Sequence, residues 1–410
     1  MNFNLIIITL SYSCNVLLFS IIMIRFLYYM YKKMFNCISA ADIYFSKNTW
    51  NNYMLGIIKY KDIDNQDLFN SYIDKFITRV KSWELQCVWY KKYNIKGIIE
   101  INETDTEDSL FYKLDQCEPQ YVNDKLLPFK IIILKKEKII FSLLNHYYCD
   151  GIVLHDFIVF NLCNKKKNCI NFFNYRYIPL LHDYFILSYV FRCFFYSFFD
   201  NYKQLEIDNN KSSVLTKNIS YDGYMNRFNS LAKTLEFLFS CVKRDELRIG
   251  FTVGFNDNNT TNNRIGIIIL NVPRQKSCED YEEYLKYNLI KYKNDSISSY
   301  DLARNFPIHY IRNSVMNNSM DVILTSFRID GENEFKNDYC YLKNLTYELG
   351  SFIGKSNYEV PIYILSNTIT HTKTINISLR SNTSELIVPN VLENDKDVKL
   401  YYEYKLIKNE

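Results

Sequence analysis

The feature that most constrains the fold of this chain is a pair of apolar, β-branched runs followed by a change of periodicity. The runs are Phe129–Leu134 and Ile139–Leu144, and the polar residues Lys135 to Lys138 separate them. Two short runs on either side of a polar turn are typical of a β-hairpin. After Gly151 the apolar residues recur every three or four positions, as on one face of a helix. The sequence therefore predicts a hairpin, a loop and a helix, in that order.

The predicted loop carries residues suited to acid-base chemistry, and it reads Asn145-His146-Tyr147-Tyr148-Cys149-Asp150-Gly151. A neutral imidazole is the usual general base near pH 7, so His146 is the candidate catalytic residue. Asp150 can fix the loop by ion pairing, and Gly151 permits the turn between a strand and a helix. Rigid elements on both sides of such a loop hold reactive side chains in place.

This loop resembles the HHxxxDG motif of the chloramphenicol acetyltransferase-like acyltransferase superfamily. The superfamily includes condensation domains of peptide synthetases, plant BAHD acyltransferases and the wax ester synthase/diacylglycerol acyltransferase group. His146 matches the catalytic second histidine of the motif, and Asp150 and Gly151 match its last two residues. Asn145 stands where the family has a first, mainly structural, histidine.

Further segments resemble the wax ester synthase/diacylglycerol acyltransferase group in order and approximate spacing. The run Asn263–Pro273 looks like the strand that an Asn-Arg pair opens in that group. The run Asp321–Ser326 is similar to a strand that carries a Ser-Asn-Val-Pro-Gly-Pro signature there, although the Pro-Gly-Pro is absent here. Ile362–Asn367 and Ile375–Leu379 resemble paired strands near the end of those enzymes. The chain is therefore expected to stand closest to this group.

The resemblance implies two α/β domains of the chloramphenicol acetyltransferase-like fold, with a tunnel between them and His146 at its midpoint. The chain has 410 residues, enough for two domains with ample cores. The polar stretch 201–217 is the predicted linker. We expect a membrane anchor over residues 1–34, a domain with the motif over 35–200, and a second acyltransferase-like domain over 218–410.

The implied reaction transfers an acyl group from acyl-CoA, the donor substrate, and no bound cofactor is expected. Because a thioester is already activated, the enzyme needs a base that takes the proton from the attacking alcohol or amine, and His146 would do this. By family analogy Asp150 pairs with an arginine, for which the candidate is Arg79; the alternative is an ordinary solvated arginine. The resemblance points to Thr325 or Ser326 as the donor to the oxyanion.

The N-terminal segment predicts a membrane anchor. From Leu5 to Ile24 the chain has no charged residue, and Arg25, Lys32 and Lys33 follow. A helix of about 20 residues rises ~30 Å, enough to cross the hydrocarbon core of a bilayer. The basic flank predicts that the catalytic domains lie on the cytosolic side, at the endoplasmic reticulum if the protein is eukaryotic. A cleaved signal peptide is the alternative, but no basic residue precedes the segment and no small-x-small cleavage site follows it.

A second aromatic-rich run, Tyr184 to Phe199, is interrupted by Arg192. It is too short and too punctuated for a predicted membrane span. Two interpretations stay open: a surface that dips into the membrane or lines an acyl channel, and a core element packed between the two halves.

Composition argues against several other classes of function. The net charge of +4 comes from interspersed residues of both signs with no basic helix, so no nucleic-acid partner is expected. The 11 cysteines form no CxxC pair and no zinc-type cluster, and His146 and Asp150 have no evident third ligand, so no metal is expected. Cys149 fits a packing role better than that of a nucleophile.

Three functions remain open from the sequence. The first, which we favour, is a membrane-anchored O-acyltransferase that transfers a fatty acyl group from acyl-CoA to a long-chain alcohol or diacylglycerol, with acyl-CoA, a lipid-like acceptor and the membrane as its partners. The second is a condensation- or BAHD-like acyltransferase that acts on an amine or a polar alcohol. The third is a non-catalytic lipid- or protein-binding member of the same fold, which Asn145 and the missing Pro-Gly-Pro motivate.

Overall fold

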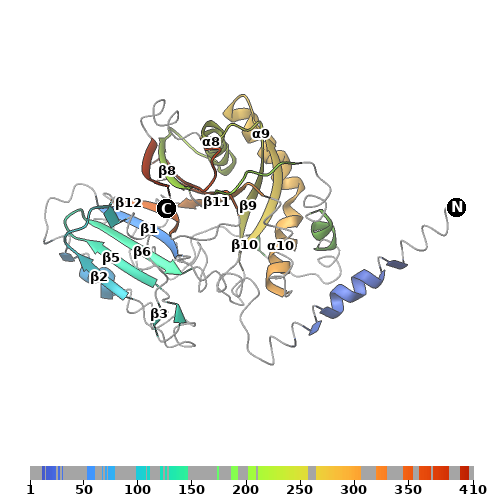
Figure 1. Ribbon diagram of the computed structural model, residues 1–410, viewed down its shortest axis with the longest axis horizontal. Coiled ribbons are helices and arrows are strands. Elements are labelled where there is room, and N and C mark those ends of the chain that lie inside the picture. The colour runs from blue at the N-terminus through green and yellow to red at the C-terminus, as the bar shows by residue number, and fades with distance from the viewer. Residues whose placement is uncertain are drawn as a thin grey trace, which may run out of the picture.

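The computed structural model forms two β-sheets with helices beside the second (Figure 1). It describes residues 12–13, 15–24, 26–27, 30, 53–60, 67, 70–71, 73–78, 98–107, 109–110, 121–122, 125–126, 129–145, 173–174, 186–192, 202–208, 211–256, 265–305, 320–329, 345–353, 360–370, 373–386 and 398–405.

The first sheet has five strands in the order β12-β1-β6-β5-β2. They are β1 (Tyr53–Tyr60), β2 (Ile98–Asn102), β5 (Phe129–Leu134), β6 (Ile139–Asn145) and β12 (Leu345–Ile353). The pairings are antiparallel, except that β2 runs parallel to β5. The predicted hairpin is confirmed as β5 and β6, with Phe129 opposite Leu144 and Leu134 opposite Ile139.

The second sheet has the order β10-β9-β11-β13-β14-β8-β15, and β7 pairs with β9 outside this path. Its strands are β7 (Phe173–Asn174), β8 (Lys211–Ser220), β9 (Glu246–Asn256), β10 (Ile265–Pro273), β11 (Val322–Ile329), β13 (Ile362–Ile369), β14 (Thr374–Ser381) and β15 (Val398–Lys405). Strand β11 is parallel to both of its neighbours, β9 and β13. A small hairpin of β3 (Tyr121–Val122) and β4 (Lys125–Leu126) stands apart.

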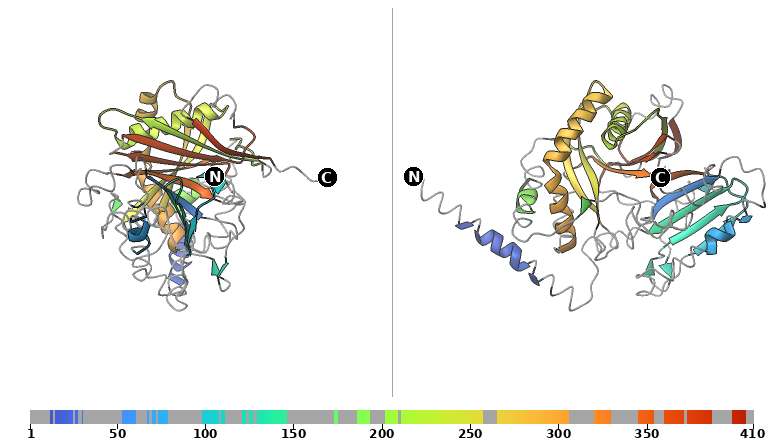
Figure 2. Two further views of the ribbon diagram at one scale, coloured as in Figure 1. Left: turned by 90° about the vertical axis from the view of Figure 1, so that its left-hand side faces the viewer. Right: turned by 180° about the vertical axis from the view of Figure 1, so that it is seen from behind.

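Helices cover one face and one edge of the second sheet. Helix α8 (Arg227–Cys241) begins at the N-cap Asn226, whose side chain accepts from the amide of Asn229, and it buries Leu231 and Leu235 in the largest core cluster. Helix α9 (Cys278–Lys291) contacts α8, and α10 (Lys293–Asn305) lies against β10 (Figure 2, right). Capping by a short polar side chain satisfies a backbone donor at the start of α8.

The opposite face of the second sheet meets the first sheet. Successive residues of a strand point to opposite faces, and in β8 Leu215 belongs to the core under α8. Its neighbour Val214 belongs instead to a cluster with first-sheet residues, among them Ile57 and Phe141. The two sheets therefore pack on each other through the face of the second sheet that α8 does not cover.

Strand β12 joins the two halves in a second way. It lies between β11 and β13 in the sequence, yet it pairs along β1 in the first sheet, with Tyr53 opposite Ile353 and Tyr60 opposite Leu345. It also contacts β13 and β14 of the second sheet. The C-terminal part of the chain thus contributes a strand to the N-terminal sheet (Figure 1).

The stretch 201–217, expected to be a linker, is instead built into the second sheet. Its last seven residues belong to β8, which pairs with β14 on one side and β15 on the other. Within 202–208 the side chain of Leu205 is buried in the main core. The sequence of this segment is polar because few of its side chains enter a core. Its β8 backbone is hydrogen-bonded to β14 on one side and to β15 on the other.

The N-terminal segment and the run 184–199 are described in part. Residues 15–24 are helical, and no helix in the described parts of the chain is both long and apolar enough to cross a membrane. The predicted anchor over Leu5–Ile24 is therefore not supported. Residues 186–192 are helical, and Ile186 and Tyr189 are buried in a cluster with β10 residues. This part of the run is therefore a core element, packed on the second sheet and not between the two sheets.

Candidate functional site

The predicted catalytic loop begins where β6 ends. Strand β6 runs through the interior of the first sheet between β1 and β5, and its last residue, Asn145, stands opposite Tyr53. His146, Asp150 and Gly151 follow it but lie outside the described residues. Arg79, the candidate partner of Asp150, also lies outside them, so the roles of these four residues stay predictions.

The two candidate oxyanion donors lie side by side in β11 and point to opposite faces of the second sheet. Leu324 belongs to the core under α8, and Ser326 shares its face because side chains of a strand alternate. Ile323 packs against the cluster on the other face, so Thr325 shares that face. Strand register places Thr325 on the same face as Val214, the face that meets the first sheet.

The Thr325 hydroxyl is fixed by a neighbouring strand. Thr252 of β9 donates a hydrogen bond from its Oγ1 to the Oγ1 of Thr325 over 3.1 Å. A threonine hydroxyl has one hydrogen to donate and two lone pairs to accept. Because Thr325 accepts from Thr252, it keeps its own hydrogen for a third atom. Thr325 is half-buried, on the face of the second sheet that meets the first sheet at Val214.

Ser326 lies in a different environment, on the side of α8. Ser366 stands opposite it in β13, and the Ser366 Oγ is 2.8 Å from the Oγ1 of Thr234 in α8. One turn away, Ser230 of α8 hydrogen-bonds to Thr368 of β13. These buried hydroxyls join α8 to the sheet, so Ser326 stands on a structural face.

The face that carries Thr325 is rich in polar side chains. Strand register aligns two rows across β13, β14 and β8, and the polar members of these rows are Thr216, Asn218, Asn367, Asn376 and Ser378. Asn367 is fully buried and Ser378 nearly so. Hydroxyl and amide groups on the inner face of a sheet can orient a polar part of a ligand.

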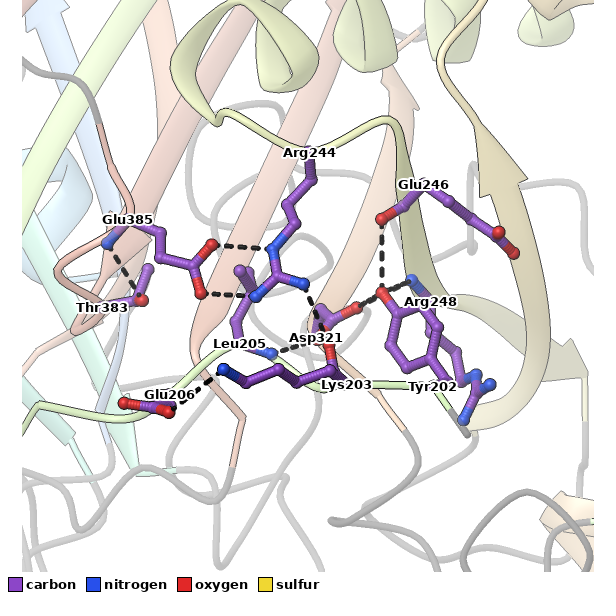
Figure 3. Close-up of polar contacts among 10 residues, drawn as sticks. All are labelled: Tyr202, Lys203, Leu205, Glu206, Arg244, Glu246, Arg248, Asp321, Thr383 and Glu385. Carbon is purple, nitrogen blue, oxygen red and sulfur yellow. Dashed lines mark hydrogen bonds and ion pairs between the residues drawn. The ribbon is translucent and has the colours of Figure 1, made fainter. Parts of the chain in front are cut away.

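A buried carboxylate lies at the start of β11, just before the strand that carries Thr325 (Figure 3). Asp321 is fully buried, and its two oxygens accept from the amides of Leu205 and Arg248, both over 2.8 Å. The hydroxyl of Tyr202 also donates to it. Burial raises the pKa of Asp321, while the Tyr202 hydrogen bond and the amide donors oppose that shift. Burial also raises the pKa of Tyr202, and the neighbouring Asp321 adds to this.

Two arginines complete this cluster. Arg248 is 1% exposed, its Nε donates to the Oδ1 of Asn271 over 2.8 Å, and its guanidinium carbon lies 4.1 Å from the centre of the Tyr202 ring. Arg244 faces Glu385 in Figure 3 and donates to it through Nε and Nη2 over 2.7 and 2.5 Å. Arg244 also donates to the backbone oxygen of Lys203.

The Asp321 cluster holds the segment 202–208 against the ends of β9 and β11. Asp321 and Arg248 are buried, Tyr202, Arg244 and Glu385 are half-buried, and their polar groups bond to one another or to nearby backbone, so the cluster fixes structure. Sequence reasoning missed it because Tyr202 and Asp321 are 119 positions apart. Within the described parts of the chain, no group of three or more histidines, cysteines or acidic residues could hold a metal ion.

Comparison with known proteins identifies the fold. No family model matches the sequence, and no curated protein matches it closely enough to be counted as a relative. Two solved structures of the starter condensation domain of rhizomide synthetase RzmA do match. A double mutant in a "product-released" conformation aligns with a TM-score of 0.52 and 10% identity over 87% of this chain and 91% of that one. A double mutant in complex with C8-CoA and Leu-SNAC aligns with a TM-score of 0.51 and 8% identity over 84% and 88%.

The chain therefore has the fold of these condensation domains. In this chain the fold consists of two mixed sheets, joined by a strand from the C-terminal half.

Proposed function

We propose that the protein is an acyltransferase that moves an acyl group from a thioester to an acceptor bound between its two sheets. A fold alone does not define a reaction, so the proposal depends on the site. The observation that carries it is the position of Thr325, whose hydroxyl lies on the face of the second sheet that packs against the first. In the first sheet the interior strand β6 leads directly into His146.

In the proposed reaction His146 takes the proton from the hydroxyl or amine of the acceptor as that atom attacks the thioester carbonyl. The carbonyl oxygen becomes an oxyanion, and the free hydrogen of Thr325 stabilises it. The carbon–sulfur bond then breaks, the carbonyl re-forms, and the thiolate leaves with the proton that His146 holds. Asp150, paired with Arg79, would keep the loop and the imidazole in place.

For the acceptor, we favour a long-chain alcohol or diacylglycerol with acyl-CoA as donor. The apolar side chains exposed along the N-terminal helix support a protein that works where such lipids are present. An amine acceptor is the second candidate, because the similar RzmA domain was solved with C8-CoA and Leu-SNAC, an amino acid thioester. A non-catalytic member of the fold is the remaining alternative, which Asn145 motivates.

The test uses the purified full chain in detergent with labelled acyl-CoA and a panel of alcohols, diacylglycerol and amines. His146→Ala should lower the rate by about 10²–10⁴-fold, the usual contribution of a general base. Thr325→Val should lower kcat by about 10²-fold with little change in KM, because an oxyanion donor acts on the transition state. Ser326→Ala, on the opposite face, is the matched control and should stay near the parent rate.

Three results would argue against the proposal. Absence of product with every acceptor would favour the non-catalytic alternative. An unchanged rate in His146→Ala would remove the base. Equal losses of rate in Thr325→Val and Ser326→Ala would show that the loss comes from a disturbed strand β11 and not from removal of the Thr325 hydroxyl.

A further inference from the structure

The N-terminal helical segment exposes a broad apolar surface. Residues 12–13, 15–24, 26–27 and 30 are helical, and within them nine large apolar side chains are between 39% and 72% exposed. They are Tyr12, Val16, Leu17, Phe19, Met23, Ile24, Phe26, Leu27 and Met30. At 3.6 residues per turn these positions cover about half of the helix circumference. An apolar surface of this extent marks an interaction site.

The other side of this helix rests on the body of the protein. Ile21 packs against the buried cluster that contains Ile186 and Tyr189 of the helix 186–192 and Ile267 of β10. Leu18 and Ile22, on the same side, are half-buried. The helix therefore has a protein-facing side and an open apolar side. The helix 186–192, whose cluster Ile21 packs against, carries another exposed aromatic residue, Phe191, which is 70% exposed.

The charge of the segment indicates what covers the open side. The first 41 residues of the sequence contain Arg25, Lys32 and Lys33 and no aspartate or glutamate. A stretch that combines an uncharged apolar helix face with basic residues only is complementary to a bilayer surface with anionic headgroups.

We infer that the open side of this helix inserts into the surface of a lipid bilayer and that the helix lies in the plane of the membrane. Its middle residue, Ile21, is attached to the body, where Arg192 forms an ion pair with Asp295 close to the same cluster. Sinking the helix midpoint to the bilayer centre would draw these charges toward hydrocarbon, which is costly. An in-plane helix keeps them at the headgroup level. This inference does not depend on the acyl-transfer proposal.

The first experiment measures flotation of the full chain, freed from detergent, with vesicles of phosphatidylcholine and with vesicles that also contain phosphatidylserine. The wild type should bind both and bind the anionic vesicles more tightly, with the excess lost at high salt. Phe19→Asp and Met23→Asp, on the open side, should each lower the partition coefficient at least about tenfold. Tyr224→Asp, which adds the same charge at an 80% exposed tyrosine on another element, should bind like wild type. Unchanged thermal unfolding of all three variants would show that they fold.

The second experiment separates the in-plane orientation from a membrane-crossing one. A tryptophan fluorophore is placed at each end of the open side by Tyr12→Trp and Met30→Trp, and near its middle by Met23→Trp. Lipids brominated at different depths of the bilayer then quench the fluorescence of each variant. Equal, shallow quenching at all three positions is expected. Deepest quenching at Met23→Trp would show a crossing helix and overturn the inference. Lack of flotation with either vesicle, or binding that the two aspartate variants leave unchanged, would overturn it as well.

Discussion

The buried Asp321 cluster leads to the sharpest prediction for stability. Asp321→Asn keeps the shape of the side chain, but it replaces one acceptor oxygen by an NH₂ group that must face a donor. The carboxylate now accepts from the amides of Leu205 and Arg248 and from Tyr202, so one of these donors is left without an acceptor. A stranded buried donor costs ~1–3 kcal/mol.

We therefore expect Asp321→Asn to lower the free energy of unfolding by about 2 kcal/mol. Urea unfolding followed by tryptophan fluorescence measures this loss. Asp222→Asn, the same substitution at an exposed position, is the matched control and should change stability by less than about 0.5 kcal/mol. In a double-mutant cycle, Tyr202→Phe should cost much less in the Asp321→Asn background than in the wild type. A loss below ~1 kcal/mol for Asp321→Asn, or additive losses in the cycle, would refute the account of the cluster.

Three further stability predictions follow from single contacts. The pKa of Glu282 is lowered to about 2, chiefly by a hydrogen bond from Lys286. Its contribution to stability is fully present above pH 4.5, the usual pKa, and is lost as pH falls through 2. Glu282→Gln should therefore cost ~1 kcal/mol at neutral pH and clearly less at pH 2, as measured by thermal unfolding. At Gly250 an added Cβ would collide with the sulfur of buried Met320, so Gly250→Ala should cost about 1–3 kcal/mol in urea unfolding, and no cost would show that Met320 moves freely. Arg244→Lys loses the bidentate hydrogen bond to Glu385 and should lower the free energy of unfolding by ~1 kcal/mol. Glu385→Gln should give a similar loss, and the two losses should not add in the double mutant.

Much of the regular structure is readable from the sequence where one face of an element is apolar. The hairpin of β5 and β6 was predictable because β-branched runs flank a short polar turn, and each strand is buried. The paired strands Ile362–Asn367 and Ile375–Leu379 correspond to β13 and β14, which are antiparallel neighbours. In these elements local pattern and tertiary packing agree.

The polar elements were not predictable in the same way. Strand β8 carries only Val214 and Leu215 as buried apolar residues, so its pattern resembles a linker, and it is a strand because β14 and β15 supply hydrogen bonds on both sides. Helix α10 is similarly polar, yet Ser299 on it bonds to the backbone of Ile267 at the sheet edge. In both β8 and α10, contacts with residues far away in the sequence determine the structure, and the local pattern does not reveal them.

The candidate site shows the same limit at the level of single side chains. From the sequence, Thr325 and Ser326 are equivalent neighbours, and resemblance alone could not choose between them. Strand alternation together with the packing of Ile323 and Leu324 assigns them to opposite faces, so that Thr325 and not Ser326 shares the face of Val214, which meets the first sheet. The choice depends on knowing which face α8 covers, and that is a tertiary fact.

Strand β12 explains why the two halves of the chain should not be treated as independent. Without β12, strand β1 would become an exposed edge of the first sheet, and an edge of that kind invites wrong pairing. Removing the first sheet would in turn leave β12 unpaired along its length and would expose Val214 on the second sheet. Each half thus needs the other to cover its own backbone and core. The proposed reaction between the two sheets would gain from this arrangement, because the strand that joins the sheets would limit how far the proposed base, His146, and the proposed donor, Thr325, can move apart.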